Sequence, residues 1–139
     1  MIVLDTNVLS ELMRSVPDVS VTNWVATQST ANLFITTITQ AEILHGVLLL
    51  PPGRRRDAIE AAADAMFEED FAGRILPFSS LAAHAYAEIA VARRQAGRPI
   101  SQFDAQIAAI AKSSGANVAT RNVPDFEGCG IKVIDPWQS

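Results

Sequence analysis

Short, unbroken runs of apolar residues recur along this chain and are separated by longer stretches in which apolar residues repeat every three or four positions. The short runs do not alternate with polar residues, which is typical of strands buried on both faces of a parallel sheet. Pro77 places one of them at a sheet edge or at a strand end. These runs predict strands over residues 2–4, 33–36, 74–78, 117–120 and 132–134.

The stretches with helical spacing predict helices, several of which have clear stop residues. Residues 51–53 end one helix, and Gly97 and Gly115 end two others. Phe103 is expected to pack inward from the last helix. The predicted helices cover residues 6–13, 18–28, 37–50, 54–70, 80–96 and 102–114. Strands and helices alternate without a linker or repeat, which predicts a single α/β domain over residues 1–139 around a mostly parallel sheet of about five strands.

The composition is that of a globular protein, because 49% of the residues are apolar and only 19% are charged. The net charge of −4 argues against a protein that coats nucleic acid non-specifically, since such binding needs an excess of lysine and arginine. This charge does not exclude a nuclease, whose acidic site can lie beside a local basic patch.

Cys129 is the only cysteine in the sequence, so no intrachain disulfide can form. We expect a cytoplasmic protein, because the sequence also lacks a signal peptide and a single cysteine suits a reducing compartment. No apolar run approaches the ~18 residues that suggest a membrane span.

Four carboxylates fall at comparable places in this pattern of strands and helices. Asp5 ends the first strand, and Asp125 follows the fourth. Glu42 and Asp104 each lie near the start of a predicted helix. Strand ends and the starts of the following helices share one edge of a parallel sheet, which is where ligands bind in such folds. We therefore expect the four side chains to converge at that edge.

Each of these acids also has an ordinary structural explanation. Asp5 is a helix-capping residue type, and Asp125 follows a proline, as turn residues often do. Glu42 follows Thr39 with the spacing of a capping box, and Asp104 stands in the same relation to a serine. An acid in the first turn of a helix also gains about 0.3–1 kcal/mol from the helix dipole.

Taken together, the four carboxylates favour a site for a divalent cation. Clustered carboxylates repel one another and raise each other's pKa unless a cation lies between them. Mg²⁺ and Mn²⁺ prefer oxygen ligands, and such an ion can activate water and stabilise the charge that builds on a phosphoryl group. Because the acids have no His or Cys partner, the pattern favours phosphodiester chemistry over a zinc site or a nucleophilic triad.

At these residues the chain resembles the PIN-domain proteins of the VapC toxin class, and more narrowly their FitB-like branch. The resemblance covers essentially the whole chain and implies a three-layer α/β/α PIN fold. Its most specific signals are Asp5-Thr6-Asn7 near the start, and Thr120-Arg121-Asn122 followed by Asp125-Phe126 near the end. Its other carriers are residues 39–43 with Gly46, residues 73–78 and residues 104–109.

This resemblance implies a Mg²⁺- or Mn²⁺-dependent endoribonuclease, the toxin of a type II toxin–antitoxin pair. It also implies a homodimer that is neutralised by a small antitoxin, forms a hetero-oligomer with it and contacts DNA only through it. In that family the acids equivalent to Asp5, Glu42, Asp104 and Asp125 form the metal site, and those equivalent to Asp5 and Asp104 are the surest ligands. The expected supporting residues are Thr6, Asn7, Thr120, Arg121 and Asn122.

Several arginines and apolar positions have more than one explanation. Arg121 is a candidate phosphate contact, or it forms an ion pair within the acid cluster. The arginines at 54–56 and at 93, 94 and 98 either guide an RNA backbone, or form a solvated helix start or pair with nearby glutamates. Helices 37–50 and 56–70 carry more apolar residues than one sheet face needs, which favours a groove for an antitoxin helix or a dimer face.

Two rival functions remain open at this point. The first is a FitB-like partner of a DNA-binding antitoxin that acts in transcriptional autoregulation with little nuclease activity. The second is a Mg²⁺-dependent phosphatase with an aspartyl nucleophile. That chemistry usually needs a second aspartate two residues after the first, and this chain has Asn7 there.

Overall fold

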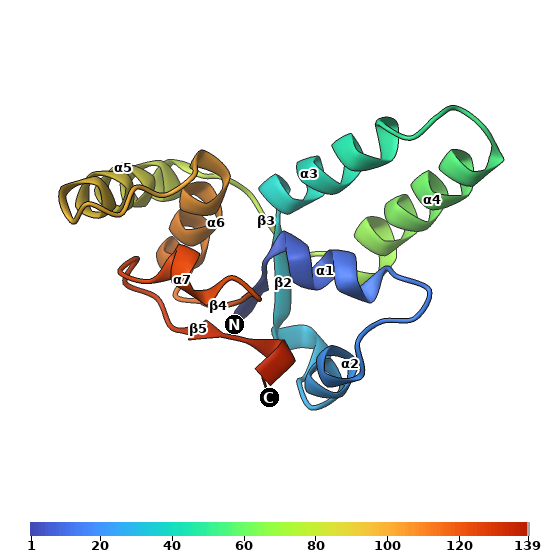
Figure 1. The fold of residues 1–139 in the computed structure, drawn as a ribbon, viewed down its shortest axis with the longest axis horizontal. Coiled ribbons are helices and arrows are strands. Elements are labelled where there is room, and N and C mark those ends of the chain that lie inside the picture. The colour runs from blue at the N-terminus through green and yellow to red at the C-terminus, as the bar shows by residue number, and fades with distance from the viewer. Residues whose placement is uncertain (139) are drawn as a thin grey trace.

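The computed structural model describes residues 1–138, and these form a five-stranded sheet in which every pair of neighbouring strands is parallel. The strands are β1 (Ile2–Leu4), β2 (Leu33–Thr36), β3 (Ile75–Leu76), β4 (Asn117–Ala119) and β5 (Val133–Ile134). They lie in the order β3-β2-β1-β4-β5, so the N-terminal strand occupies the centre (Figure 1). The carboxyl ends of all five strands therefore share one edge.

Helices cover both faces of this sheet. The helices are α1 (Thr6–Leu12), α2 (Val19–Ala26), α3 (Thr37–Leu48), α4 (Arg54–Ala65), α5 (Ser80–Gln95), α6 (Gln102–Ser113), α7 (Val123–Phe126), and the short turns η1 (Thr30–Asn32), η2 (Met66–Asp70) and η3 (Pro136–Gln138). One hydrophobic cluster joins the sheet to α1–α4, and a second joins it to α5–α7. The three-layer α/β/α fold is thus confirmed. Within residues 1–138 no helix is both long and apolar enough to cross a membrane.

β1 is central because its residues are apolar on both sides of the strand. Ile2 and Leu4 belong to the cluster under α1–α4, and Val3 belongs to the cluster under α5–α7. Val3 pairs with Phe34 of β2 on one side and with Val118 of β4 on the other. All three β1 side chains are buried, and this packing fixes the position of β1 and of Asp5, which follows it directly.

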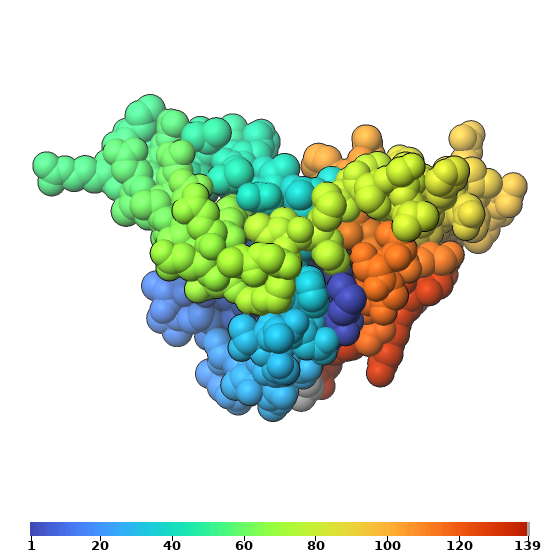
Figure 2. All heavy atoms as spheres, turned by 180° about the vertical axis from the view of Figure 1, so that it is seen from behind, coloured from blue at the N-terminus to red at the C-terminus, as the bar shows by residue number. Residues whose placement is uncertain are grey.

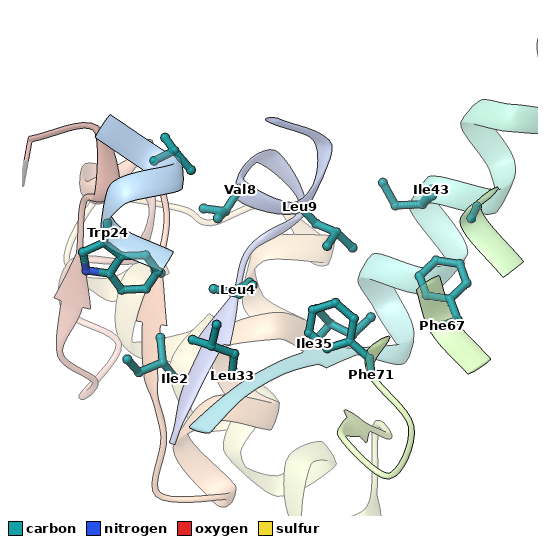
Figure 3. Packing of buried hydrophobic residues seen from close by; sticks show 13 residues of the cluster. Ile2, Leu4, Val8, Leu9, Trp24, Leu33, Ile35, Ile43, Phe67 and Phe71 are labelled. Carbon is teal, nitrogen blue, oxygen red and sulfur yellow. The ribbon is translucent and has the colours of Figure 1, made fainter. Parts of the chain in front are cut away.

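The two hydrophobic clusters differ in the size of their side chains. Figure 3 shows the first, in which Trp24 and Phe67 are buried with the large aliphatic residues of β1 and β2. In the second cluster many positions are alanine, including Ala82 and Ala85 of α5 and Ala108 of α6. Because interhelical distance depends on the side chains at the contact, these small residues suit a close approach of α5 and α6.

Several local expectations are corrected by the structure. The helix expected over 54–70 is α4 followed by the wider π-helical turn η2. The strand expected over 74–78 is reduced to β3, which lies at the sheet edge as Pro77 predicted. Phe103 does not pack inward, because 55% of its surface is exposed. The sequence does not predict α7, a helix of four residues with a proline in its first turn.

Helices α3 and α4 form a hairpin that projects from the body of the molecule. Figures 1 and 2 show the two helices side by side, with their connection at the tip of the projection. Leu48 and Leu49 near this tip are 54% and 72% exposed. The arginines of residues 54–56 follow at the start of α4. The tip therefore offers exposed leucines beside positive charges.

Candidate active site

A pocket of about 590 Å³ lies at the carboxyl-end edge of the sheet, beside the starts of α1, α3 and α6. All four acids singled out from the sequence line it, together with side chains from α1, η3 and the segment after β4. The lining residues are Asp5, Thr6, Asn7, Ser10, Glu11, Arg14, Glu42, Asp104, Arg121, Asn122, Asp125 and Trp137. Sequence segments that are far apart thus meet at one concave surface.

Asp5 is the most deeply buried of the four acids, with 5% of its surface exposed. Its backbone N–H donates to the Ala119 carbonyl of β4 at 2.9 Å, which extends the central pairing by one residue. Its carboxylate accepts hydrogen bonds from the Thr6 N–H at 2.8 Å, the Thr120 hydroxyl at 2.9 Å and the Asn7 amide at 3.1 Å. Asp5 therefore caps α1, as the structural explanation predicted, and also lines the pocket.

The electrostatic environment of Asp5 disfavours its charged form. Burial raises the pKa of Asp5 to about 6, although the hydrogen bonds from Thr120 and Thr6 act in the opposite direction. The charges of Asp104 and Glu42 raise this pKa further. The carboxylate is thus held by neutral donors, and a nearby positive charge would stabilise it.

Glu42 reaches the pocket from α3 through a different cap from the one the sequence suggested. The N-cap of α3 is Thr36, whose hydroxyl accepts from the Thr39 N–H at 3.1 Å, so Thr39 and Glu42 do not form the proposed capping box. Instead the Thr6 hydroxyl donates to Glu42 Oε1 at 3.0 Å and lies 2.9 Å from the Thr39 hydroxyl. Burial raises the pKa of Glu42, the Thr6 hydrogen bond lowers it and the Asp104 charge raises it.

Asp104 lies in the first turn of α6, where Ser101 is the N-cap and accepts from the Asp104 N–H at 3.2 Å. Burial raises the pKa of Asp104, the hydrogen bond with Ser101 lowers it, the Asp125 charge raises it and the Arg93 charge lowers it. Asp125 lies in α7 and is exposed to solvent. The acids of α6 and α7 are therefore close enough to repel each other.

Thr120, one of the predicted supporting residues, links Asp5 to the predicted supporting residues Asn7 and Asn122 by hydrogen bonds. Its side chain is fully buried, donates to Asp5, and accepts from the Asn7 amide and from the Asn122 N–H, both at 3.1 Å. Asn7 Oδ1 in turn accepts from the Arg121 N–H at 3.2 Å. This network holds the end of β1 against the segment after β4 and fixes the direction of the Asp5 carboxylate.

Arg93, which the sequence offered as an RNA contact, a solvated helix residue or a partner of a nearby glutamate, is instead buried with 6% of its surface exposed. Its guanidinium donates to the carbonyl oxygens of Arg98 at 2.6 Å, Asp125 at 2.9 Å and Glu127 at 2.8 Å. It therefore ties α5 to the segment that carries Asp125. The four-residue spacing from Ala85 and Ile89 places Arg93, unlike the exposed Arg94, on the buried face of α5, but the distant carbonyl oxygens that it binds could not be predicted.

Four other residues of the pocket were not among the predicted site residues, namely Ser10, Glu11, Arg14 and Trp137. Glu11 forms an ion pair with Arg14 at 3.1 Å, three residues along α1, a spacing that the sequence does contain. Trp137 reaches the pocket from η3, and its position depends on how the C-terminal segment folds back. Only tertiary structure could have placed Trp137 at the site.

The donors around the pocket fit a hard divalent cation. Within residues 1–138 none of the four acids forms an ion pair with lysine, arginine or histidine, although the Arg93 charge lowers the pKa of Asp104. In the described part of the chain no three His, Cys, Asp or Glu side chains are grouped closely enough to ligate one ion together. Mg²⁺ usually keeps several water ligands and takes only one or two carboxylates, so the oxygen donors present suit it without a preformed cage.

The sequence model of the PIN domain matches residues 2–125. The chain is 41% identical to the plasmid stability protein StbB of Pseudomonas syringae pv. tomato over 100% of both chains. It is 38% identical to the VapC ribonuclease Y4jK of Sinorhizobium fredii over 99% of both. The chain therefore belongs to the PIN-domain family, in the group that contains the VapC and FitB toxins.

Solved structures agree with this assignment. The crystal structure of FitAcB from Neisseria gonorrhoeae matches at a TM-score of 0.94 and 36% identity, and the match covers 100% of both chains. A structure of FitAB bound to an IR36 DNA fragment matches at a TM-score of 0.93, covering 99% of this chain and 96% of that chain. The five-stranded fold and its central β1 are thus those of known toxins of this group.

Proposed function

We propose that this protein is the toxin of a type II toxin–antitoxin pair and acts as a Mg²⁺- or Mn²⁺-dependent endoribonuclease. The observation that carries the proposal is the convergence of Asp5, Glu42, Asp104 and Asp125 on one pocket without an ion-pair partner. Burial raises the pKa of Asp5, Glu42 and Asp104, and the charges of neighbouring acids add to the rise. The name of the VapC ribonuclease Y4jK supports RNA as the substrate.

In this proposal Asp5 and Asp104 are the principal ligands of the ion, and Glu42 and Asp125 complete the acidic wall. Bound there, Mg²⁺ or Mn²⁺ would supply an activated water and neutralise charge on the phosphoryl group. Hydrolysis then adds the water oxygen to phosphorus and breaks one P–O ester bond, releasing an alcohol end and a phosphate end. Asp125 is the most exposed of the acids.

The supporting residues keep these acids in place before substrate arrives. Thr120 and Asn7 fix the Asp5 carboxylate, and Thr6 fixes Glu42. Hydrogen bonds that orient ligands in advance reduce the reorganisation needed when charge develops in the reaction. Among these residues, Thr120 is fully buried and its hydroxyl is hydrogen-bonded to Asp5, Asn7 and Asn122, so its substitution should affect metal affinity most.

We further propose that a groove between α1, α3 and α4 receives an apolar segment of the antitoxin. This groove measures about 330 Å³ and is lined mainly by apolar residues, including Met13, Ile43, Val47, Leu50 and Ile59. Thr6, Ser10 and Glu42 line both this groove and the acidic pocket. An antitoxin bound there would lie beside the acids, which explains how one segment could block the site. The FitAB and FitAcB complexes support such a partner.

A homodimer in the cytoplasm remains part of the proposal. Exposed apolar side chains on α5 and α6 offer a surface for a second copy, with Leu81, Val91 and Phe103 exposed by 71%, 53% and 55%. Large apolar residues gathered on a surface are typical of protein interfaces. Sedimentation of the purified toxin with and without its antitoxin would establish the number of copies.

The test is cleavage of a mixed pool of tRNA and rRNA by the purified protein, freed of its antitoxin, in Mg²⁺, in Mn²⁺ and in EDTA. We expect discrete cuts that require metal and that fall at least a hundredfold in Asp5→Asn and Asp104→Asn, since one ligand is removed in each. Asp64→Asn is the matched control, because Asp64 is an exposed aspartate of α4 that does not line the pocket.

A second candidate function is regulation through a DNA-bound complex with little nuclease activity. The structure of FitAB bound to DNA favours it, because that toxin is present in a complex on DNA. RNA that stays intact with every metal, while the toxin still increases the affinity of its antitoxin for operator DNA, would establish this alternative. Cleavage that persists equally in Asp5→Asn and Asp104→Asn would refute the metal-site assignment.

A further inference from the structure

The acidic pocket also contains a cation stacked on an aromatic ring. The guanidinium carbon of Arg121 lies 5.1 Å from the centroid of the Trp137 ring, and both side chains line the pocket with the four acids. Arg121 follows β4 directly, and Trp137 comes from η3. The proposed hydrolysis uses neither side chain, although both face the space where a substrate would lie.

Arg121 is held beside the acids by its backbone. Its N–H donates to Asn7 Oδ1 at 3.2 Å, while the Asn7 amide donates to Asp5. Its neighbour Thr120 donates to the same carboxylate. The main chain of Arg121 is therefore fixed two hydrogen bonds away from Asp5, and its side chain extends from that point toward η3.

The guanidinium of Arg121 is not used for an ion pair. Arg121 is exposed, and within residues 1–138 no carboxylate lies within ion-pair distance of it, despite four acids around the same pocket. The sequence left open an ion pair within the acid cluster, and the structure contradicts it. A guanidinium that lies on an aromatic ring keeps its N–H donors free at the edge, where they can bind a phosphate.

Trp137 is a firm partner for this cation. Its backbone N–H donates to Asp135 Oδ1 at 2.9 Å, and its side chain packs against the hydrophobic cluster under α1–α4. The ring is half-buried and still reaches the pocket. An indole held in this way provides a rigid flat surface, which is the feature that unpaired nucleobases use when they stack on protein.

We propose that Arg121 and Trp137 form a nucleotide subsite that holds the unpaired nucleotide next to the scissile phosphate of single-stranded RNA. On binding, the exposed Arg121 guanidinium moves off the ring to the neighbouring phosphate, and the base stacks on the indole face that it uncovers. This proposal rests on the ribonuclease function proposed above and deepens it. Because every base has a face that can stack, the subsite selects unpaired RNA over duplex RNA and does not read a particular base.

The experiment measures binding separately from cleavage. A short fluorescein-labelled single-stranded RNA of mixed sequence is titrated with protein in EDTA, where cleavage is absent, and a duplex RNA of the same length is titrated in parallel. We expect Trp137→Ala to weaken binding of the single strand roughly fivefold or more, with little change for the duplex. Trp137→Phe keeps an aromatic face and should retain most of the affinity.

The two side chains are distinguished by their salt dependence. Arg121→Met should lower the slope of log affinity against log salt concentration by about 0.7, the value for one phosphate contact on a single strand. Arg121→Lys should keep the slope, since the charge is retained, and lose part of the affinity with the stacked plane. Lys132→Met is the matched control, because Lys132 is an exposed cation that does not line the pocket.

Intrinsic fluorescence supplies a direct readout. The chain has two tryptophans, and Trp24 is buried in the core, so quenching by RNA should come from Trp137 and disappear in Trp137→Phe. Equal loss of single-strand and duplex binding in Trp137→Ala would overturn the subsite and leave the pair as a fastening of the C-terminal segment. The melting temperature of each variant identifies one that fails to fold, and the milder Trp137→Phe and Arg121→Lys variants then decide the question.

Failure of the subsite and failure of the ribonuclease proposal have different signatures. Unchanged binding in all four variants, with normal metal-dependent cleavage, overturns the subsite alone. Selective single-strand binding with no cleavage in any metal overturns the nuclease and retains the subsite. In a protein with both functions, Trp137→Ala should raise KM for single-stranded RNA and leave kcat nearly unchanged.

Discussion

The Asp5 carboxylate accepts hydrogen bonds from Thr6, Asn7 and Thr120, yet within residues 1–138 no basic side chain forms an ion pair with it. A buried carboxylate in this situation loses hydration that neutral donors replace only in part. The protein thus carries an electrostatic cost at the end of its central strand. A bound cation removes that cost, so metal binding and folding stability should be coupled at this residue.

The metal-free protein should therefore become less stable as the pH rises through 6. Burial raises the pKa of Asp5 to about 6. It also raises the pKa of Glu42 and the pKa of Asp104 above their ordinary values. A carboxyl with a raised folded-state pKa stabilises the fold fully below its unfolded pKa, and that contribution is lost as the pH rises through the folded value. We expect a higher urea midpoint in EDTA at about pH 5 than at about pH 7.5.

Saturating Mn²⁺ supplies the control for this pH dependence. It should raise the midpoint at the higher pH and reduce the difference between the two conditions, because the ion binds the ionised carboxylates. Asp104→Asn should show less of this rescue. A urea midpoint of the metal-free protein that is the same at both pH values would contradict an energetic cost of ionising the buried Asp5 carboxyl.

At the scale of elements, the short helix α7 depends on another helix for its position. Arg93 of α5 donates to the carbonyl oxygens of Asp125 and Glu127, on either side of the C-terminal end of α7. A helix of four residues cannot be stable alone, since forming the first turn of a helix is unfavourable. Arg93 therefore replaces the hydrogen bonds that a longer helix would make for itself.

Substitution of Arg93 by methionine tests this dependence. The change removes a buried side chain and leaves partly buried carbonyl oxygens without this donor, so we expect a loss of about 2–4 kcal/mol in the free energy of unfolding, measured with urea. The affinity for Mn²⁺ should also fall, because Asp125 is no longer held beside Asp104. Arg94→Met is the control. Arg94 is exposed, so this substitution should change the free energy of unfolding by less than about 0.5 kcal/mol.

The same elements explain how far sequence reasoning could go. The short apolar runs of β1 and β2 are typical of strands buried on both faces of a sheet. These strands, and the acids that follow them, were therefore predictable. Thr36 as the cap of α3 was not, because Thr36, Thr37 and Thr39 are all capping residue types within four positions. The roles of Arg93 and Trp137 likewise depend on contacts between segments that no local pattern records.

At the scale of the whole molecule, the acidic pocket and the apolar groove share a wall. Thr6, Ser10 and Glu42 line both, with the groove on the side of the projecting α3–α4 hairpin. An occupant of the groove would therefore contact Glu42 and the Thr6 hydroxyl that holds it, at the edge of the acidic pocket. The arrangement lets one partner cover the hydrophobic surface and control access to the acids at the same time.

Substitution of Ile59 by aspartate separates these two functions. Ile59 lines the apolar groove from α4 and does not line the acidic pocket. A buried charge in the groove should weaken antitoxin binding at least tenfold, measured by titration calorimetry, while metal-dependent cleavage is retained. Ala58→Asp is the control, because it adds the same charge at the exposed neighbouring position. Loss of cleavage in Ile59→Asp, with antitoxin binding intact, would contradict the assignment of the groove.

The order in which the pocket residues occur along the chain has a consequence for protein synthesis. Asp5 leaves the ribosome early. The strand β4, which pairs with β1, is translated more than a hundred residues later, and so is Asp125, the last of the four acids. An unfinished or truncated polypeptide therefore has neither the central pairing nor the full set of carboxylates. A cell that makes this toxin is thus exposed to an assembled site only once translation of each copy is nearly complete.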